Sequence, residues 1–224
     1  MAMQTAVDNV LAGRILDTAL ALAETRGSWE ALRLHDVAEA LDISLAEVHA
    51  CYAQKDDLAE AWFDRADRVA LRECERGDFA ALPPADRLER VILAWLEALA
   101  PHRRLTRGML AYKLEPGHLH LQLPGLVRIS RTVQWFREAA WQDSTGVRRI
   151  LEEAGLTLIY VRSFTRWLFD ETPGAQRTRQ GLARDLRRLY GRSGTAGTAA
   201  GEATGEVAQV AGPEAEPPHT TGSG

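Results

Sequence analysis

Side chains that could carry out catalysis are few in this sequence and poorly placed for it. Asp56 and Asp57 are adjacent in a predicted helix, as are Glu152 and Glu153, so the members of each pair point to different sides and cannot act together as general acid and base. The sequence contains no phosphate-binding loop and no zinc-protease motif, and its histidines do not have the spacing of metal ligands. We therefore expect no enzyme activity, no cofactor and no metal site.

The composition is that of an ordinary globular protein. Of the 224 residues, 46% are hydrophobic and 26% are charged, which excludes collagen-like, mucin-like and transporter classes and fits one or two domains. No stretch approaches the roughly 18 apolar residues of a membrane-spanning helix. The two cysteines, Cys51 and Cys74, lie in helical patterns, so we expect a reducing cytoplasm rather than a disulfide scaffold.

Apolar residues recur at helical spacing almost everywhere, which predicts an all-α fold. Pro83 and Pro84 cannot continue a helix and predict a domain boundary, giving domains over 8–76 and 85–190. The prolines and glycines of 115–125 predict a loop, and the small residues of 191–224 predict a disordered tail. The predicted helices cover 8–26, 33–41, 45–52, 54–76, 85–100, 102–114, 126–142, 146–169 and 174–190.

Three of these helices fall in the first 52 residues, and a short turn over 42–44 joins the last two, which is the spacing of a helix-turn-helix. Ser44 is suited to cap the third helix. The runs ILDTALALAETRG, LHDVAEALDIS and VHACYAQKDDL resemble the N-terminal domain of the TetR/AcrR regulators over roughly residues 12–65. The resemblance implies a third helix that enters the major groove, a second domain of about five or six helices that binds a small ligand, and a homodimer made by the last two helices.

The same resemblance gives five candidate DNA-binding residues, Arg33, Glu47, His49, Tyr52 and Lys55. Lys55 matches the family pattern most clearly and is expected to contact the DNA backbone. Arg33 stands where a threonine commonly caps the second helix, so an arginine replaces the usual hydroxyl contact. Glu47 could accept a hydrogen bond from a cytosine amino group or be a solvated charge, and the sequence leaves both open. The rest of the predicted reading helix is poor in phosphate donors, with Leu45, Ala46 and Ala50.

Charge divides the chain into two unlike parts. Residues 1–60 hold four basic and eleven acidic residues, a net charge of −7, which is unfavourable for a polyanion partner. Residues 101–190 hold 16 basic and eight acidic residues, a net charge of +8. The last predicted helix joins an apolar stripe of Leu182, Leu186 and Leu189 to five arginines. This pattern fits anionic lipid headgroups, a partner helix, or a helix that packs on its neighbour and exposes a charged face.

A second resemblance covers the C-terminal half. The runs TVQWFREAAWQDST, LTLIYVRSFTRWLFDETPG and LARDLRRL, between Thr132 and Leu189, resemble the C-terminal domain of the ubiquinone-biosynthesis accessory proteins, which share the TetR fold. This resemblance implies an isoprenoid ligand, loss of DNA binding, and contact with a membrane and a partner enzyme. An apolar pocket for either kind of ligand is predicted to be lined by Trp95, Tyr112, Trp135 and Phe164, although aromatics at helical spacing also fit a plain core.

Two hypotheses about function follow. The first is a homodimeric transcriptional regulator that binds a palindromic operator and is controlled by a small apolar ligand. The second is a lipid-binding accessory protein of quinone biosynthesis that no longer binds DNA, which the charge distribution favours.

Overall fold

The structure is a computed structural model that describes residues 2–114 and 119–202, and over these residues it contains helices and turns but no strand. The predicted all-α fold is confirmed. The α-helices are α1 Ala2–Thr25, α2 Leu34–Leu41, α3 Leu45–Cys51, α4 Lys55–Arg72, α5 Pro84–Leu99, α6 Arg103–Leu114, α7 Leu119–Ala139, α8 Gly146–Leu168 and α9 Gln176–Glu202.

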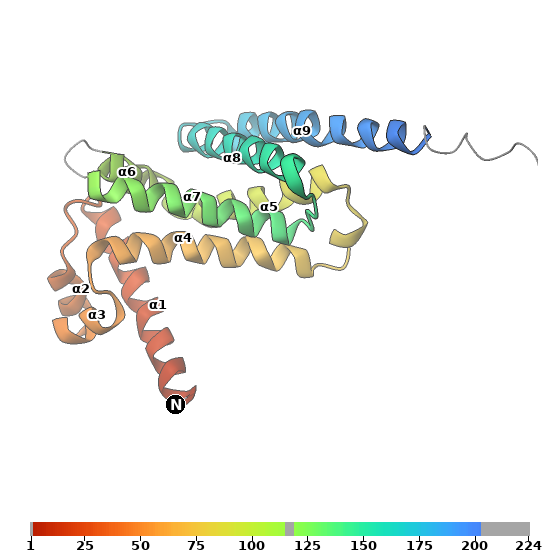
Figure 1. Cartoon of the computed structure of the whole chain (residues 1–224). Helices are drawn as coiled ribbons and strands as arrows, with labels where there is room; N and C mark the ends of the chain where they lie inside the picture. The colour runs from red at the N-terminus through yellow and green to blue at the C-terminus, as the bar shows by residue number, and fades with distance from the viewer. Residues whose placement is uncertain (1, 115–118, 203–224) are drawn as a thin grey trace, which may run out of the picture.

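The helices are arranged around the long α4 (Figure 1). Helices α1, α2 and α3 form a small bundle at one end, and α4 runs out of that bundle along α5 and α7. Helices α8 and α9 lie side by side as an outer layer at the opposite side of the molecule from α4. Because α4 packs on α1 as well as on α5, it links the N-terminal bundle mechanically to the remaining helices.

Four element boundaries differ from the predictions by four residues or more, and the first is that α1 begins at Ala2 rather than at residue 8. Helix α4 ends at Arg72, four residues early, and a 3₁₀ helix over Glu73–Glu75 follows it. Helix α7 begins at Leu119, inside the predicted loop, and includes Pro124, although a proline beyond the first turn cannot donate the backbone hydrogen bond of a helix. Helix α9 continues past 190 to Glu202, although the stretch 191–202 contains four glycines, which disfavour a helix. The rest of the predicted tail, 203–224, lies outside the described residues.

Aromatic rings fill the core between α4, α5, α7 and α8. Trp95 is buried on α5, and its ring lies edge-on to those of Phe136, Tyr160 and Phe164, with centroids 6.3, 5.4 and 5.0 Å away. Phe63 of α4 stacks with Trp95 at 6.1 Å. Interlocked rings of this kind leave each neighbour little freedom to shift. The core therefore fixes α4 against the C-terminal helices.

A buried polar cluster joins the same helices beside these rings. Asp67 of α4 is only 7% exposed, and its carboxylate accepts hydrogen bonds from the Trp95 indole N–H at 2.7 Å and the Thr132 hydroxyl at 3.3 Å. The Arg128 guanidinium of α7 donates to the second oxygen of Asp67 at 2.9 Å and also pairs with Asp64. Burial raises the pKa of Asp67, while Arg128 and the hydrogen bonds oppose that rise. The cluster thus connects α4, α5 and α7 through one carboxylate.

Two glycines allow α8 and α9 to approach closely. A Cβ atom at Gly155 would lie 3.0 Å from Cδ1 of Leu189, and one at Gly181 would lie 1.7 Å from Nη1 of Arg166. At Gly155, α8 is therefore in close contact with α9 of its own chain.

The turn between α8 and α9 is organised by Asp170. Its carboxylate is buried and accepts hydrogen bonds from the backbone N–H and hydroxyl groups of both Thr172 and Thr178. Burial opposes ionisation of this carboxyl group, but the four hydrogen bonds outweigh it and hold the pKa of Asp170 far below its ordinary value. The ionised side chain therefore fixes where α9 begins relative to α8.

Replacing Asp170 with asparagine is expected to make the stability of the protein less dependent on acidic pH. A carboxyl group whose pKa is lowered by folding stabilises the native state above its unfolded pKa of about 3.9, and that contribution is lost as the pH falls towards the folded value. Urea unfolding of the wild type and of Asp170→Asn between neutral pH and about pH 2 should show a steeper loss of stability in the wild type. Parallel curves for the two proteins would contradict this prediction.

Candidate nucleic-acid interface

The turn between α2 and α3 has the geometry that the sequence predicts. Helix α2 ends at Asp42, whose φ of 53° lies in the left-handed region, and the N–H of Ile43 donates to the carbonyl of Ala38 at 3.0 Å. Ser44 then caps α3, because its hydroxyl accepts a hydrogen bond from the backbone N–H of Glu47 at 3.2 Å. Two helices joined by such a short turn, and both packed on α1, form a helix-turn-helix.

One face of α3 is open to solvent. Val48 is buried against the bundle, whereas Leu45, Ala46, His49 and Ala50 are exposed. At about 100° per residue, these four positions fall within about 140° of the helix circumference. Helices α2 and α3 lie at the free end of the molecule, away from α8 and α9 (Figure 1). The segment predicted to read DNA is therefore on the outer surface.

The Glu47 side chain is hydrogen-bonded at the start of α3. Its carboxylate accepts hydrogen bonds from the backbone N–H of Ser44 and from the Ser44 hydroxyl, each at 2.8 Å. These bonds to Ser44, backbone first, lower the pKa of Glu47 and keep it ionised. The side chain thus completes a capping box, a third role beside the two that the sequence left open.

Tyr52 and Lys55 also make internal contacts. The Tyr52 hydroxyl donates to the carbonyl of Ala12 at 3.0 Å, which fastens the end of α3 to α1. The Lys55 ammonium donates to the carbonyls of Glu30 and Leu32, both at 3.0 Å. Burial lowers the pKa of Lys55. In this structure Lys55 holds the segment before α2, and two of its three N–H groups are engaged within the bundle.

The remaining bases near α3 differ in availability. Arg26 forms an ion pair with Asp36, so its charge is largely compensated within the bundle. Arg33 is exposed at the position before α2, and its side chain makes no capping hydrogen bond there. The sequence-predicted residues are thus separated by the structure into exposed groups, Arg33 and His49, and internally bonded groups, Glu47, Tyr52 and Lys55.

Comparison with known proteins identifies the family. No protein-family model and no curated protein matches the sequence. Among solved structures, a TetR transcriptional regulator from Nitrosomonas europaea ATCC 19718 is 44% identical, with a TM-score of 0.71, and the match covers 80% of this chain and 98% of that one. This chain belongs to the TetR family of transcriptional regulators. A TetR transcriptional regulator from Rhodococcus sp. RHA1 shares the fold at 17% identity, with a TM-score of 0.61 over 83% of this chain and 97% of that one.

Membership of the TetR family bears on the two hypotheses. The matched chains are described as transcriptional regulators, which supports the first hypothesis and gives no support to the accessory-protein alternative. Across residues 2–114 and 119–202, no group of histidine, cysteine and acidic side chains could hold a metal ion. None of the described helices is long and apolar enough to cross a bilayer.

The four residues predicted to line a ligand pocket in this TetR chain do not surround a common cavity. Trp95 and Phe164 pack against each other in the aromatic core, Tyr112 is partly buried on α6, and Trp135 is 47% exposed on α7. A hollow of about 100 Å³ between α5, α8 and α9 is lined by none of the four and is small beside ligand pockets, which measure about 300–1,000 Å³. The structure places Trp95 and Phe164 in the plain core that the sequence left open as an alternative.

The basic last helix is oriented by its apolar stripe. Leu182 and Leu186 are fully buried within the chain, so the stripe is not available to a membrane or a partner helix. Arg179, on the same helix, pairs with Glu97 of α5. Of the three alternatives for this helix, the structure confirms that it packs on its neighbours and exposes a charged face.

Sequence reasoning missed an apolar surface on α8. Leu156, Tyr160 and Trp167 are buried on the core side of this helix, and their helical spacing is the pattern that predicts it. A second set of apolar residues is exposed on the opposite side of the helix, namely Val147, Ile150, Leu151, Leu158 and Val161. A helix that is apolar on two sides is a signal visible in the sequence, and it indicates a second contact surface. We call these five residues the outer face of α8.

Proposed function

We propose that this TetR-family chain binds a palindromic DNA operator as a homodimer, with α3 of each copy in the major groove. The proposal rests chiefly on the exposed face of α3, which follows the turn of a helix-turn-helix. It is supported by the similarity of this chain to a TetR regulator, which the match covers over 98% of its length. In helix-turn-helix proteins the second helix of the motif lies in the major groove, and twofold dimers bind half-sites one helical turn or a multiple of it apart.

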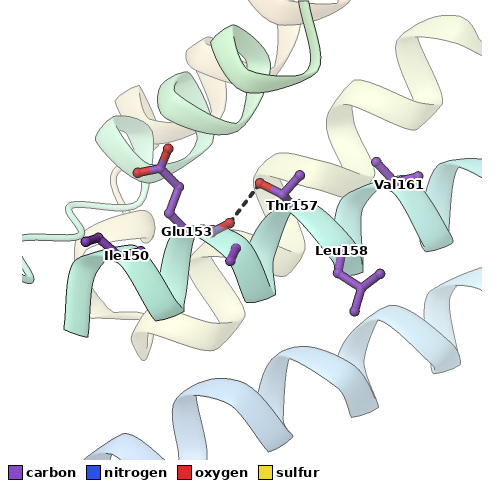
Figure 2. A pocket seen from close by; sticks show the side chains of 6 residues that line it. Ile150, Glu153, Thr157, Leu158 and Val161 are labelled. Carbon is purple, nitrogen blue, oxygen red and sulfur yellow. Dashed lines mark hydrogen bonds between the residues drawn. The ribbon is translucent and has the colours of Figure 1, made fainter. Parts of the chain in front are cut away.

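The outer face of α8 supports the proposed homodimer. Figure 2 shows Ile150, Leu158 and Val161 along this helix, beside Glu153 and Thr157. Ile150 and Leu158 are 67% and 69% exposed, which is unfavourable in water unless another surface covers them. A twofold interface uses the same patch on both subunits, and a helix face of this kind is self-complementary. We propose that the outer face of α8 packs against α8 and α9 of a second copy.

The charge of the N-terminal bundle limits the strength of the proposed DNA contact. The first 60 residues carry a net charge of −7, and two of their four bases, Arg26 and Lys55, are engaged within the bundle. Sequence-independent affinity comes from cations that neutralise phosphates and release counterions. We therefore expect Arg33, rather than Lys55, to be the main backbone contact, and the total affinity to be strong only at low salt.

Replacing Arg33 with alanine is expected to weaken operator binding. The slope of log K against the logarithm of the salt concentration should become shallower by about one, which is the value for one lost phosphate contact. Arg33 is exposed, so the unfolding curve should not change. Fluorescence anisotropy of a labelled operator at several salt concentrations measures both quantities. Arg72→Ala, which removes an exposed charge at the far end of α4, is the matched control and should leave both unchanged. An unchanged salt slope in Arg33→Ala would remove Arg33 from the interface.

Selection of binding sites from random duplexes by the full-length protein tests the proposed function itself. At low salt the protein should enrich palindromic sequences whose binding weakens steeply as salt is added. Absence of any DNA binding at low salt would overturn the proposal.

We also propose, from the family resemblance alone, that a small apolar ligand controls this binding. Such a ligand would have to displace packed rings, because Trp95 and Phe164 are in contact in this structure. Native mass spectrometry of the purified protein should then reveal a bound apolar compound, whose addition lowers operator affinity. A protein that purifies and remains ligand-free in the presence of candidate apolar compounds would contradict this part of the proposal.

A further inference from the structure

The exposed face of α3 is mainly apolar, which is unusual for a surface that must meet hydrogen-bonding base edges. Leu45 occupies the first position of the helix and is 49% exposed, and Ala46 and Ala50 are exposed beside it. His49 is the polar member of this face. Three of the four side chains that would point at DNA can therefore neither donate nor accept a hydrogen bond.

The polar side chains at the edges of this face are held by the protein itself. The Glu47 carboxylate is bonded to Ser44, the Tyr52 hydroxyl to Ala12, and the Lys55 ammonium to the carbonyls of Glu30 and Leu32. Reading cytosine with Glu47 would break two hydrogen bonds that cap α3. Arginine or lysine, asparagine or glutamine, and glutamate or aspartate are the usual partners of guanine, adenine and cytosine. Of these residue types α3 contains Glu47 alone, and its carboxylate is already bonded to Ser44.

Thymine is the base whose major-groove edge carries an apolar group, the C5 methyl. Alanine and other apolar side chains contact this methyl directly, and small side chains also let the helix approach the base edges closely. We infer that α3 recognises thymine methyl groups, and that thymines contacted by Leu45, Ala46 and Ala50 determine the operator half-site of this regulator. The inference rests on the proposed function and adds to it the chemistry by which the operator is chosen.

Replacement of thymine with deoxyuridine tests this inference, because it removes only the methyl group and keeps base pairing intact. The full-length protein is first used to select half-sites from random duplexes at low salt, and each thymine of the best half-site is then replaced in turn. We expect about fourfold weaker binding for each contacted methyl, the effect of burying one methyl-sized group, and no change at thymines outside the half-site.

Two variants connect the effect to α3. Leu45→Ala retains a helix-forming residue at an exposed position, and its shorter side chain should reduce the deoxyuridine effect at one thymine of the half-site. Arg72→Ala, at the far end of α4 and outside the proposed interface, is the control, and in it every deoxyuridine effect should persist.

The possible results separate this inference from the function on which it depends. Selective DNA binding that does not change when thymines become deoxyuridines overturns thymine-methyl recognition and leaves the proposed function standing. A lack of any DNA binding at low salt overturns both. Deoxyuridine effects that are the same in Leu45→Ala as in the wild type exclude Leu45 as a contact.

Discussion

Asp67→Ala is expected to lower the free energy of unfolding by about 3–5 kcal/mol, the usual cost of removing one partner of a buried ion pair. In this variant Arg128, which also pairs with the more exposed Glu60 and Asp64, loses its one buried carboxylate partner, and the Trp95 indole N–H loses its acceptor. Both groups would remain out of water, so neither recovers its lost interaction from solvent. Urea unfolding followed by circular dichroism measures the effect.

Two further variants identify the buried pair as the cause. Asp64 also contacts Arg128 but its side chain is 43% exposed, so Asp64→Ala should cost no more than about 1 kcal/mol. The double variant Asp67→Leu with Arg128→Met removes both charges, and it should be clearly more stable than Asp67→Ala alone. Equal losses in Asp64→Ala and Asp67→Ala would show that burial at Asp67 does not decide the stability of this cluster.

Leu158→Glu is expected to convert the proposed homodimer into a monomer and to weaken operator binding by about a hundredfold. A carboxylate at this position would be buried on both subunits of a twofold interface, and the cost of removing two carboxylates from water opposes association. A monomer contacts one half-site, so it loses the gain in affinity that comes from binding two linked half-sites, which is about a hundredfold or more. Light scattering after size-exclusion chromatography measures the mass, and anisotropy of a labelled operator measures the binding.

Val127→Glu is the matched control for this substitution. Val127 is also an exposed apolar residue, but it lies on α7 outside the outer face of α8, so its replacement should leave the mass and the operator affinity unchanged. A Leu158→Glu protein that remains dimeric and binds its operator normally would place the interface elsewhere on the molecule.

The N-terminal bundle was predictable because its signals are local. The short turn over 42–44, the cap at Ser44 and the helical spacing around Val48 each involve residues within a few positions of one another, and the structure confirms all three. The start of α7 and the end of α9 were predicted wrongly. Pro124 lies inside α7, and the glycine-containing stretch beyond 190 is helical as far as Glu202, although both residue types disfavour a helix.

By itself the sequence determined the all-α class, the helix-turn-helix and the unequal distribution of charge, because helical periodicity, caps and charge counts need no knowledge of distant contacts. Only the tertiary structure decided which of the predicted DNA-binding side chains are free. Lys55 is held by carbonyls more than 20 residues away and Tyr52 by one 40 residues away, and such contacts arise only when the helices pack. Packing likewise buried Trp95 and Phe164 in the core and left the outer face of α8 exposed, since burial depends on which helices meet and not on the residue type alone.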